Sequence, residues 1–434
     1  MKTLLLLLAG LLALAPASRA QQPASTAGWQ LRFVVYLSRH GVRSPTGKAS
    51  QLDQYSIAPW PKWSVAPGYL TPHGYQLMQL FGAYDRSLLA SEGLFAPTGC
   101  DDARRITIYA DSDQRTRETG KALAAGLFPG CNLPVGSLPE GTQDPLFHPA
   151  RSASPQATAL AAAAISGRVG GDPKNLTLAY HAQLAQLDDI LSRCGTPPAQ
   201  DPPRVSLFNI SAALNSGMGD HAAELRGPLS TAATLSEDIL LEYTDGMPEK
   251  DVAWGCVNGD SLRSLINLHT ASFDFAQRTP AVARMQASNL LDRIDRAIRQ
   301  AASGRPVPGA PDKPSDRALF LVGHDTNIAN IAGLLHLTWI ADGRRDDTAP
   351  GSALVFELWQ NKATGAYSVR AYLTVQTLEQ MRTAATLDTA NPPARVPLFL
   401  PACGAADGSC PLDAFSRTLR TALDPAAVTS PAKP

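Results

Sequence analysis

The sequence predicts an α/β protein that is interrupted by a mostly helical domain. Short apolar runs typical of buried strands recur in the first and last thirds of the chain, and helical patterns separate the early ones. The middle, residues 154–277, is rich in Ala and Leu, has helical periodicity and shows no convincing strand. We therefore expect a discontinuous α/β domain of residues 21–153 and 278–434, with residues 154–277 inserted as a helical cap.

Each element is expected from its local pattern. Thr71 and Pro72 predict a helix start as N-cap and first-turn proline, and the apolar side of that helix comprises Tyr75, Met78, Leu80 and Phe81. Another helix is expected around residues 121–127. The expected strands are residues 31–37, 105–110, 318–322, 353–359 and 367–375, the last two forming a hairpin.

The amino terminus has the pattern of a secretory signal peptide. Lys2 precedes an apolar stretch over residues 4–15, and Ser18 and Ala20 suit cleavage after residue 20. We therefore expect a periplasmic or secreted protein, and the apolar stretch is too short for a comfortable membrane span. Lys and Arg together number 38, as do Asp and Glu, so removing Lys2 and Arg19 leaves a net charge of about −2. Such a balance predicts no general attraction to nucleic acid or anionic membranes.

The six cysteines are expected to form disulfides. An exported chain folds under oxidising conditions, and neither Cys-x-x-Cys nor histidine-rich spacing indicates a metal site. The residues alone leave the pairing open.

A basic turn follows the first expected strand. It reads Ser38-Arg39-His40-Gly41-Val42-Arg43-Ser44-Pro45-Thr46. The guanidinium groups of Arg39 and Arg43 match the oxygens of a phosphate, and the imidazole of His40 can attack phosphorus without first losing a proton of high pKa. The turn therefore predicts a phosphate site that contains a nucleophile.

Two further polar turns follow expected strands. Residues 323–327 read Gly-His-Asp-Thr-Asn, and residues 111–117 read Asp-Ser-Asp-Gln-Arg-Thr-Arg. Ligands of open α/β sheets bind beyond the carboxyl ends of strands, where all three turns are expected to meet.

Arg-His-Gly-x-Arg-x-Pro followed late in the chain by His-Asp resembles the histidine acid phosphatases, and within them the bacterial phytases. The resemblance covers nearly all of the mature chain and implies an α/β domain, whose central mixed sheet carries helices on both faces, with a helical cap over the active site. It places the third arginine of a phosphate clamp at Arg115, while Arg117 is equally well a solvated charge. It also implies disulfides Cys100–Cys131 and Cys403–Cys410, leaving Cys194 and Cys256 to pair or to remain free.

The chemistry of a phosphate monoester assigns the expected roles. Without a metal or another cofactor, Arg39, Arg43 and Arg115 must supply the counter-charge. His40 is expected to form a phosphohistidine through one ring nitrogen while the other donates to a main-chain carbonyl. His324 adds a donor, and Asp325 protonates the leaving alkoxide, so activity should be highest at acidic pH.

The substrate is expected to be a small phosphate monoester and in particular phytate, because Gly41, Thr326 and residues 44–46 match the phytase branch. Candidate contacts to further phosphates are Thr46 and Lys48. Glu237, which matches a glutamate of the cap, is expected to limit substrate choice. The alternatives are a glucose-1-phosphatase, a broad-specificity acid phosphatase, or a protein that binds phosphoesters without turnover. We expect a monomer.

Several residues admit other interpretations. Asp325 suits a helix cap, and His40 with His324 suit a metal site only if further ligands exist and the nearby arginines are tolerated. Residues 259–262 spell the Gly-Asp-Ser-Leu signature of an esterase family, with Ser261 as nucleophile, but Asp260 more naturally caps a helix. The histidines expected to be structural are His73, His148, His181, His221, His269 and His336.

Overall fold

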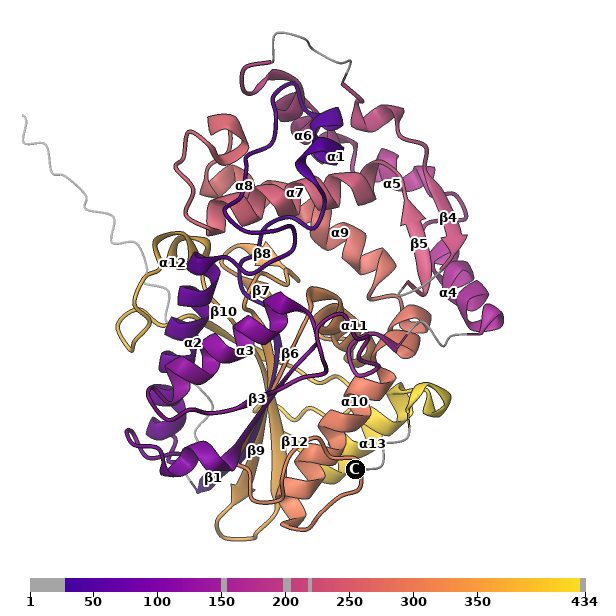
Figure 1. The fold of residues 1–434 in the computed structure, drawn as a ribbon. Coiled ribbons are helices and arrows are strands. Elements are labelled where there is room, and N and C mark those ends of the chain that lie inside the picture. Colours follow the sequence, from indigo (N-terminus) through magenta and orange to yellow (C-terminus); the bar gives the residue numbers. More distant parts are fainter. Residues whose placement is uncertain (1–27, 150–153, 198–203, 218–220, 430–434) are drawn as a thin grey trace, which may run out of the picture.

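The computed structural model describes residues 28–149, 154–197, 204–217 and 221–429. The expected signal peptide, residues 1–20, lies outside the described residues. Figure 1 shows a sheet with helices on both sides and, at one end of it, a region formed mainly by helices. Among the described residues, every helix is too short or too polar to cross a bilayer.

The central sheet is mixed, as predicted. Strands β1, β6, β2 and β3 run parallel to one another, whereas β9 pairs antiparallel with β1, and β9, β10 and β11 pair antiparallel with one another in turn. All five expected strands are present, with bounds that differ by at most two residues. The strand order is β11 (Ala394–Leu398), β10 (Tyr367–Val375), β9 (Ala353–Asn361), β1 (Trp29–Arg39), β6 (Ala318–Gly323), β2 (Ile106–Ala110), β3 (Val135–Gly136), with β12 (Cys410–Pro411) beside β10.

Strand β1 separates two hydrophobic cores. Phe33, Val35 and Leu37 face one core, and Val34 and Tyr36 face the other. A strand that is buried on both faces needs apolar residues at successive positions, which explains why its sequence is a continuous apolar run. The first core contains α10 (Pro280–Ser303), α11 (Asp325–Leu335) and α13 (Leu412–Ala422), and the second contains α2 (Pro72–Ser91) and α3 (Gln114–Leu127).

Helix α2 begins where the sequence predicts. The Thr71 Oγ1 accepts a hydrogen bond from the Gly74 amide at 2.8 Å, and the Thr71 amide donates to the Val42 carbonyl at 3.0 Å. A Cβ on Gly74 would lie 2.1 Å from that same carbonyl oxygen, so only glycine fits here. The first turn of α2 thereby holds the loop that follows His40.

The helical region contains one pair of strands that the sequence analysis missed. Strands β4 (Ala213–Ser216) and β5 (Ala223–Arg226) pair antiparallel, which corrects the expectation of a segment without strands. They are short, have no β-branched residue and are only half-buried, so they lack the pattern that predicts a strand. The helices are α4 (Pro155–Arg168), α5 (Lys174–Ala179), α6 (His181–Arg193), α7 (Pro228–Thr244), α8 (Gly259–Leu265) and α9 (Asn267–Ala276).

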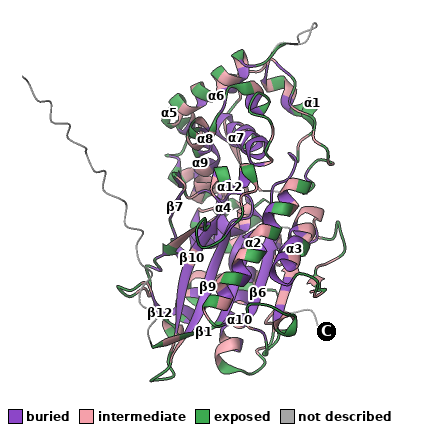
Figure 2. Cartoon of the chain, turned by 90° about the vertical axis from the view of Figure 1, so that its left-hand side faces the viewer, coloured by how far each residue is buried: buried purple, intermediate pink, exposed green. Residues whose placement is uncertain are grey.

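Helix α7 is the buried centre of this region (Figure 2). The segment between β1 and α2, which includes α1 (Ala49–Leu52), also packs here: the Ile57 amide donates to the Leu191 carbonyl at 2.9 Å, and Trp60 contacts Trp254. Part of the amino-terminal third therefore covers the helical region.

The start of α8 differs from the sequence prediction. Asn258, rather than Asp260, is the N-cap, and its side chain accepts from the Ser261 amide at 2.9 Å. The Ser261 hydroxyl hydrogen-bonds Asn258, while Asp260 pairs with Arg263 at 3.0 Å. Ser261 thus belongs to a helix cap, which explains the Gly-Asp-Ser-Leu sequence without an esterase.

The described cysteines form three disulfides, Cys100–Cys131, Cys194–Cys256 and Cys403–Cys410. The two pairs implied by the family resemblance are therefore present, and Cys194 and Cys256 pair rather than remain free. Such a set is typical of proteins that fold outside the reducing cytosol. The remaining elements are β7 (Ile340–Ala341), β8 (Arg344–Arg345) and α12 (Leu378–Thr383).

Candidate active site

Three polar turns meet at one edge of the sheet because the strands that lead into them are parallel neighbours. Arg39 of β1 lies opposite Gly323 of β6, and Ala110 of β2 lies opposite Val322. The His40 amide donates to the Gly323 carbonyl at 2.9 Å, which extends the β1–β6 pairing into the turn. Residues nearly three hundred positions apart in the sequence are thus neighbours, as the strand pattern predicts.

His40 is a buried, neutral imidazole. Burial, followed by the charges of Arg115, Arg39 and Arg43, lowers its pKa well below the ordinary value. Its Nδ1 donates a hydrogen bond to the Gly41 carbonyl at 2.9 Å, the main-chain contact that the sequence analysis expected. A neutral ring with the proton on Nδ1 carries its lone pair on Nε2, so Nε2 is available as a nucleophile.

Carboxylates accompany all three arginines. The fully buried Arg39 pairs with Glu237 and with Asp325 Oδ2, the latter at 2.9 Å from its Nη2. Arg43 Nη2 lies 3.5 Å from Glu237 Oε2, and Arg115 Nη2 lies 2.5 Å from Asp113 Oδ2.

Some arginine donors nevertheless remain unused. The Nε atoms of Arg39, Arg43 and Arg115 are buried and have no hydrogen-bond partner among the described residues. Buried donors are nearly always satisfied in native proteins, so arginines that keep unused donors favour an anionic ligand at this place.

Helix α11 starts at the same place, with its amino terminus toward the site. His324 is the N-cap and Asp325 is the first helical residue, so the alternative of Asp325 as the cap is wrong by one position. The His324 amide donates to Asn327 Oδ1 at 2.8 Å, and Asp325 Oδ1 accepts from the Thr326 amide at 2.7 Å. Helix amino termini favour anions, which adds to the attraction of the arginines.

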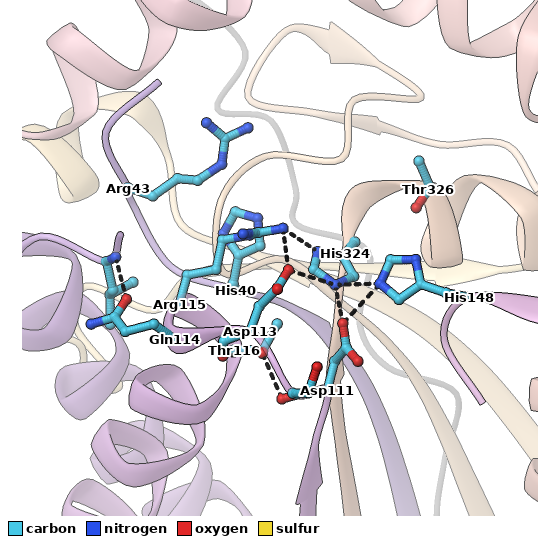
Figure 3. Close-up of polar contacts among 12 residues, drawn as sticks. His40, Arg43, Asp111, Asp113, Gln114, Arg115, Thr116, His148, His324 and Thr326 are labelled. Atoms are coloured by element: carbon cyan, nitrogen blue, oxygen red, sulfur yellow. Dashed lines mark hydrogen bonds and ion pairs between the residues drawn. The ribbon is translucent and has the colours of Figure 1, made fainter. Parts of the chain in front are cut away.

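His148 belongs to this site, although the sequence analysis took it as structural. Its Nε2 and the Nε2 of His324 both approach Asp111 Oδ2, at 2.8 and 2.6 Å, and lie 3.2 Å from each other (Figure 3). Burial alone would raise the pKa of Asp111, but hydrogen bonds from both imidazoles hold it well below the usual range. His148 lies in a loop without periodicity, where no sequence pattern predicts its position.

Two groups of His and carboxylate side chains lie close enough together to be considered as metal sites. One contains Asp111, Asp113, His148 and His324, and the other contains Glu237, His269 and Asp325. Neither group contains His40, but each offers at least three possible ligands. The Arg115 guanidinium, however, lies 2.5 Å from Asp113 and 3.4 Å from His324 Nδ1, and Arg39 pairs with both carboxylates of the second group. Guanidinium groups that already occupy the carboxylates would repel a cation, so the residues fit a metal poorly.

The turns open into a cavity of about 450 Å³. A larger groove of about 630 Å³ lies between α10, α11 and α13, but mostly apolar side chains line it and it contains none of the converging groups. The smaller cavity is therefore the candidate active site, because the converging polar groups line it. Its lining residues are His40, Arg43, Thr46, Arg115, Phe147, His148, His221, Gln277, Gln286, His324, Asp325, Thr326 and Asn330.

The structure brings together most, but not all, of the expected site residues. Thr46 lines the cavity, whereas Lys48 is exposed at the start of α1 and is not among the lining residues. Glu237 acts on the site through Arg39 and Arg43 rather than by lining the cavity. His221, expected to be structural, lines the cavity. Arg117 pairs with Glu140 on the surface at 3.0 Å.

Comparisons with known proteins agree with this geometry. The family model described as Histidine phosphatase superfamily (branch 2) matches residues 30–192 and 207–374. Phytase AppA of Escherichia coli is 38% identical over 411 residues, covering 92% of this chain and 93% of that protein. A glucose-1-phosphatase of Salmonella typhimurium is 29% identical over 410 residues, covering 93% and 95%. The structure of Hafnia alvei phytase in complex with myo-inositol hexakis sulphate has a TM-score of 0.83 and 36% identity, covering 93% of this chain and 100% of that chain.

Proposed function

The chain belongs to the histidine phosphatase superfamily (branch 2), and on that premise we propose that it is a phytase that releases phosphate from phytate through a phosphohistidine on His40. The observation that carries the proposal is the neutral His40 imidazole, which lines the cavity together with Arg43 and Arg115. A nucleophile that is kept unprotonated beside fixed positive charge suits attack on a phosphate monoester.

In the first step, His40 Nε2 forms a bond to phosphorus while the bond from phosphorus to the ester oxygen breaks. The leaving alkoxide is a poor leaving group unless it is protonated, and Asp325 is the carboxyl group that lines the cavity next to His324. Arg39, Arg43 and Arg115 stabilise the charge on the transferring phosphoryl oxygens, which makes a metal unnecessary for this role. The products are the phosphohistidine and the free alcohol.

In the second step, water attacks the phosphohistidine. The phosphorus–nitrogen bond breaks, His40 recovers its lone pair, and phosphate leaves. The ionised Asp325 left by the first step can take the proton of the attacking water, which restores the acid for the next turnover.

His324 requires a defined protonation state to assist. Its Nε2 donates to Asp111, and its Nδ1 is 3.4 Å from Arg115 Nη2. Donation from Nδ1 to a phosphoryl oxygen therefore requires a second proton. Burial lowers the pKa of His324, the hydrogen bond to Asp111 opposes this shift, and the charge of Arg115 adds to it, so the second proton must be supported by the charge of the bound phosphate. We assign Asp111 as a positioning residue for His324.

Phytate is the proposed substrate because similarity to phytases extends over nearly the whole chain and the cavity is large enough for more than one phosphate group. Thr46 is the proposed contact to a neighbouring phosphate. Lys48 is not retained in that role because it does not line the cavity, and Glu237 is proposed to set the charge of Arg39 and Arg43. We also propose that residues 1–20 direct export and that residues 154–277 act as the cap.

The experiment compares wild type with His40→Ala. Phosphate release from phytate, glucose 1-phosphate and p-nitrophenyl phosphate is measured across pH with a chelator present. Acid-favoured release from phytate that is lost in His40→Ala, together with rapid-quench trapping of an acid-labile phosphoryl group on His40, supports the proposal. Release from glucose 1-phosphate alone would reassign the substrate to the chemistry named for the Salmonella relative.

A further inference from the structure

The peptide group that joins His40 to Gly41 is held at both of its ends. Its carbonyl oxygen, that of His40, accepts a hydrogen bond from the Gly351 amide at 2.9 Å. Its N–H group, that of Gly41, donates to Thr119 Oγ1 at 2.9 Å. A third contact, from the His40 amide to the Gly323 carbonyl at 2.9 Å, fixes the preceding peptide group. Of these three contacts, only that with Thr119 uses a side chain, so it is the one that depends on a particular residue type.

The Thr119 hydroxyl also contacts the part of the chain that carries the third arginine of the clamp. It is fully buried and lies one turn after Arg115 on α3. A hydroxyl has a single proton, and the Gly41 amide can only donate, so Oγ1 accepts from Gly41 and gives its own proton to the Arg115 carbonyl, 2.7 Å away. The two hydrogen bonds therefore have defined directions. Together they set the position of the His40 turn relative to the start of α3.

Gly41 lies where a displacement of the main chain would be transmitted to the nucleophile. A Cβ at this position would lie 2.8 Å from Met78 Cγ and 3.0 Å from the Gly74 carbonyl oxygen, both on α2. The Gly41 carbonyl accepts from His40 Nδ1 at 2.9 Å, the bond that keeps the lone pair of the ring on Nε2. Gly41 thus contacts α2 by close packing and α3 through Thr119, and the orientation of the attacking ring depends on where Gly41 lies.

Loss of the Thr119 hydroxyl would affect this arrangement directly. Among the described residues, Thr119 is the only hydrogen-bond acceptor of the Gly41 amide. A buried donor that loses its acceptor is costly, so the turn would have to shift to satisfy it. Attack on phosphorus requires the nucleophile at a defined distance and direction, and a misplacement of about 1 Å can reduce the rate about 100-fold. The hydroxyl is therefore expected to matter for the rate as well as for stability.

We propose that Thr119 is a positioning residue for phosphoryl transfer, because its hydroxyl fixes the turn that carries His40 relative to Arg115. Thr119 is buried and is not among the residues that line the cavity, so it acts through Gly41 and Arg115 rather than by touching the substrate. The inference rests on the proposed function, because the turn that it concerns carries the proposed nucleophile. It adds a residue of α3 that holds two of the converging turns together.

The test compares Thr119→Val with Thr119→Ser. Val has nearly the shape of Thr but lacks the hydroxyl, whereas Ser keeps the hydroxyl and lacks the methyl group. Thr119→Val should reduce the rate of nitrophenol release from p-nitrophenyl phosphate in a single turnover by about 10- to 100-fold, the effect of one unsatisfied buried donor. Thr119→Ser should stay within about threefold of wild type. Inhibition by inorganic phosphate should change by less than about threefold in both, because the three arginines remain.

Ser288 of α10 provides a matched control. Its buried Oγ donates to the Arg284 carbonyl one turn earlier at 2.6 Å and accepts from the Asp424 amide at 2.7 Å, the same pair of contacts that Thr119 makes. Ser288→Ala should lower the urea midpoint of unfolding as Thr119→Val does, but it should leave the single-turnover rate within about twofold of wild type. If Thr119→Val does not fold, Thr119→Ala removes the same hydroxyl and should show the same loss of rate.

A wild-type rate in the folded variants without the Thr119 hydroxyl overturns the proposal. A loss that Thr119→Ser shares, or that Ser288→Ala shares, also overturns it, because the effect would then come from packing or from stability rather than from the hydroxyl at this turn.

Trapping of the phosphoryl group separates this inference from the proposed function. If wild type forms a phosphohistidine on His40 and Thr119→Val forms it at the same rate, the positioning role fails and the phosphohistidine mechanism stands. If wild type forms none, but Thr119→Val loses turnover and Thr119→Ser retains it, the phosphohistidine mechanism fails and the positioning role stands.

Discussion

His40 and His324 end neighbouring parallel strands, yet the structure gives them opposite surroundings. His40 lies among Arg39, Arg43 and Arg115, and in the described part of the chain its ring bonds only to a main-chain carbonyl. His324 donates to Asp111 at 2.6 Å and has a second imidazole, His148, beside it. The same side chain thus keeps one nitrogen available for attack in one turn and is held by a carboxylate in the other. The difference comes from the neighbours that each strand end meets.

The strongest way to break this comparison is to remove the nucleophile. His40→Ala should reduce kcat for p-nitrophenyl phosphate by at least about 10⁴-fold, because the group that forms the covalent intermediate is removed. Inhibition by inorganic phosphate should persist, since the arginines remain. Turnover within about tenfold of wild type would show that water attacks directly and that His40 is only a donor.

The loss of activity on replacing Asp325 should depend on how readily the leaving group departs without a proton. Asp325→Asn should reduce kcat/KM for phytate, which reports the first step alone, by about 10²- to 10⁴-fold, the usual contribution of general acid catalysis. The loss should be much smaller for p-nitrophenyl phosphate, whose phenolate leaves without a proton. Equal losses for both substrates would instead assign Asp325 to the Arg39 ion pair that it forms at 2.9 Å.

Replacing Asp111, the carboxylate that His148 and His324 share, tests the role of the surroundings of His324. An amide at position 111 keeps an acceptor oxygen but loses the negative charge that both Nε2 donors meet at Oδ2, so Asp111→Asn should reduce kcat by about 10- to 100-fold, the effect of one charge-assisted hydrogen bond. The pH dependence of kcat should also change, because His324 loses its support for a second proton. A reduced kcat with an unchanged pH profile would indicate a structural role only.

The turns that carry His40 and His324 are the part of the site that the sequence predicts. The strands before His40 and His324 are apolar runs buried on both faces, so their positions and the meeting of their turns could be predicted. His148 and Glu237 reach the site from a loop and from the buried helix α7, and no local pattern reveals where such residues lie in space. Lys48 shows the converse, because closeness to the motif in sequence did not place it in the cavity. The strands β4 and β5 are too short and polar to be recognised.

The smallest predicted effect concerns stability and contrasts His40 with a buried carboxyl group of α7. Because the pKa of His40 is lowered in the folded protein, the unfolded chain binds a proton at this residue below about pH 6.5 whereas the folded protein does not. Protonation therefore favours the unfolded state, and stability is lost as pH falls. Burial, and then the charge of Glu237, raises the pKa of Asp238 to about 8. The unfolded chain releases this proton near pH 4, so stability is lost as pH rises from about 4 to about 8.

Relative to wild type, His40→Gln should therefore gain stability as pH falls, and Asp238→Asn should gain as pH rises, each by at least about 1.4 kcal/mol, the value of one pKa unit. Urea unfolding at several pH values measures both trends. Parallel trends for the two variants would contradict the assigned protonation states.

The sheet order also has a consequence for how the chain must be made. β1 emerges first, but both of its partners, β6 and β9, lie after residue 317. During synthesis, the apolar strand that ends just before His40 therefore stays with both edges unpaired until the helical region and β6 have been made. Long-range pairing of this kind is slow and exposes aggregation-prone edges. A chain stopped before β6 would carry the nucleophile but could not assemble any part of a working site, so partial products should be removed by quality control rather than retained as weak enzymes.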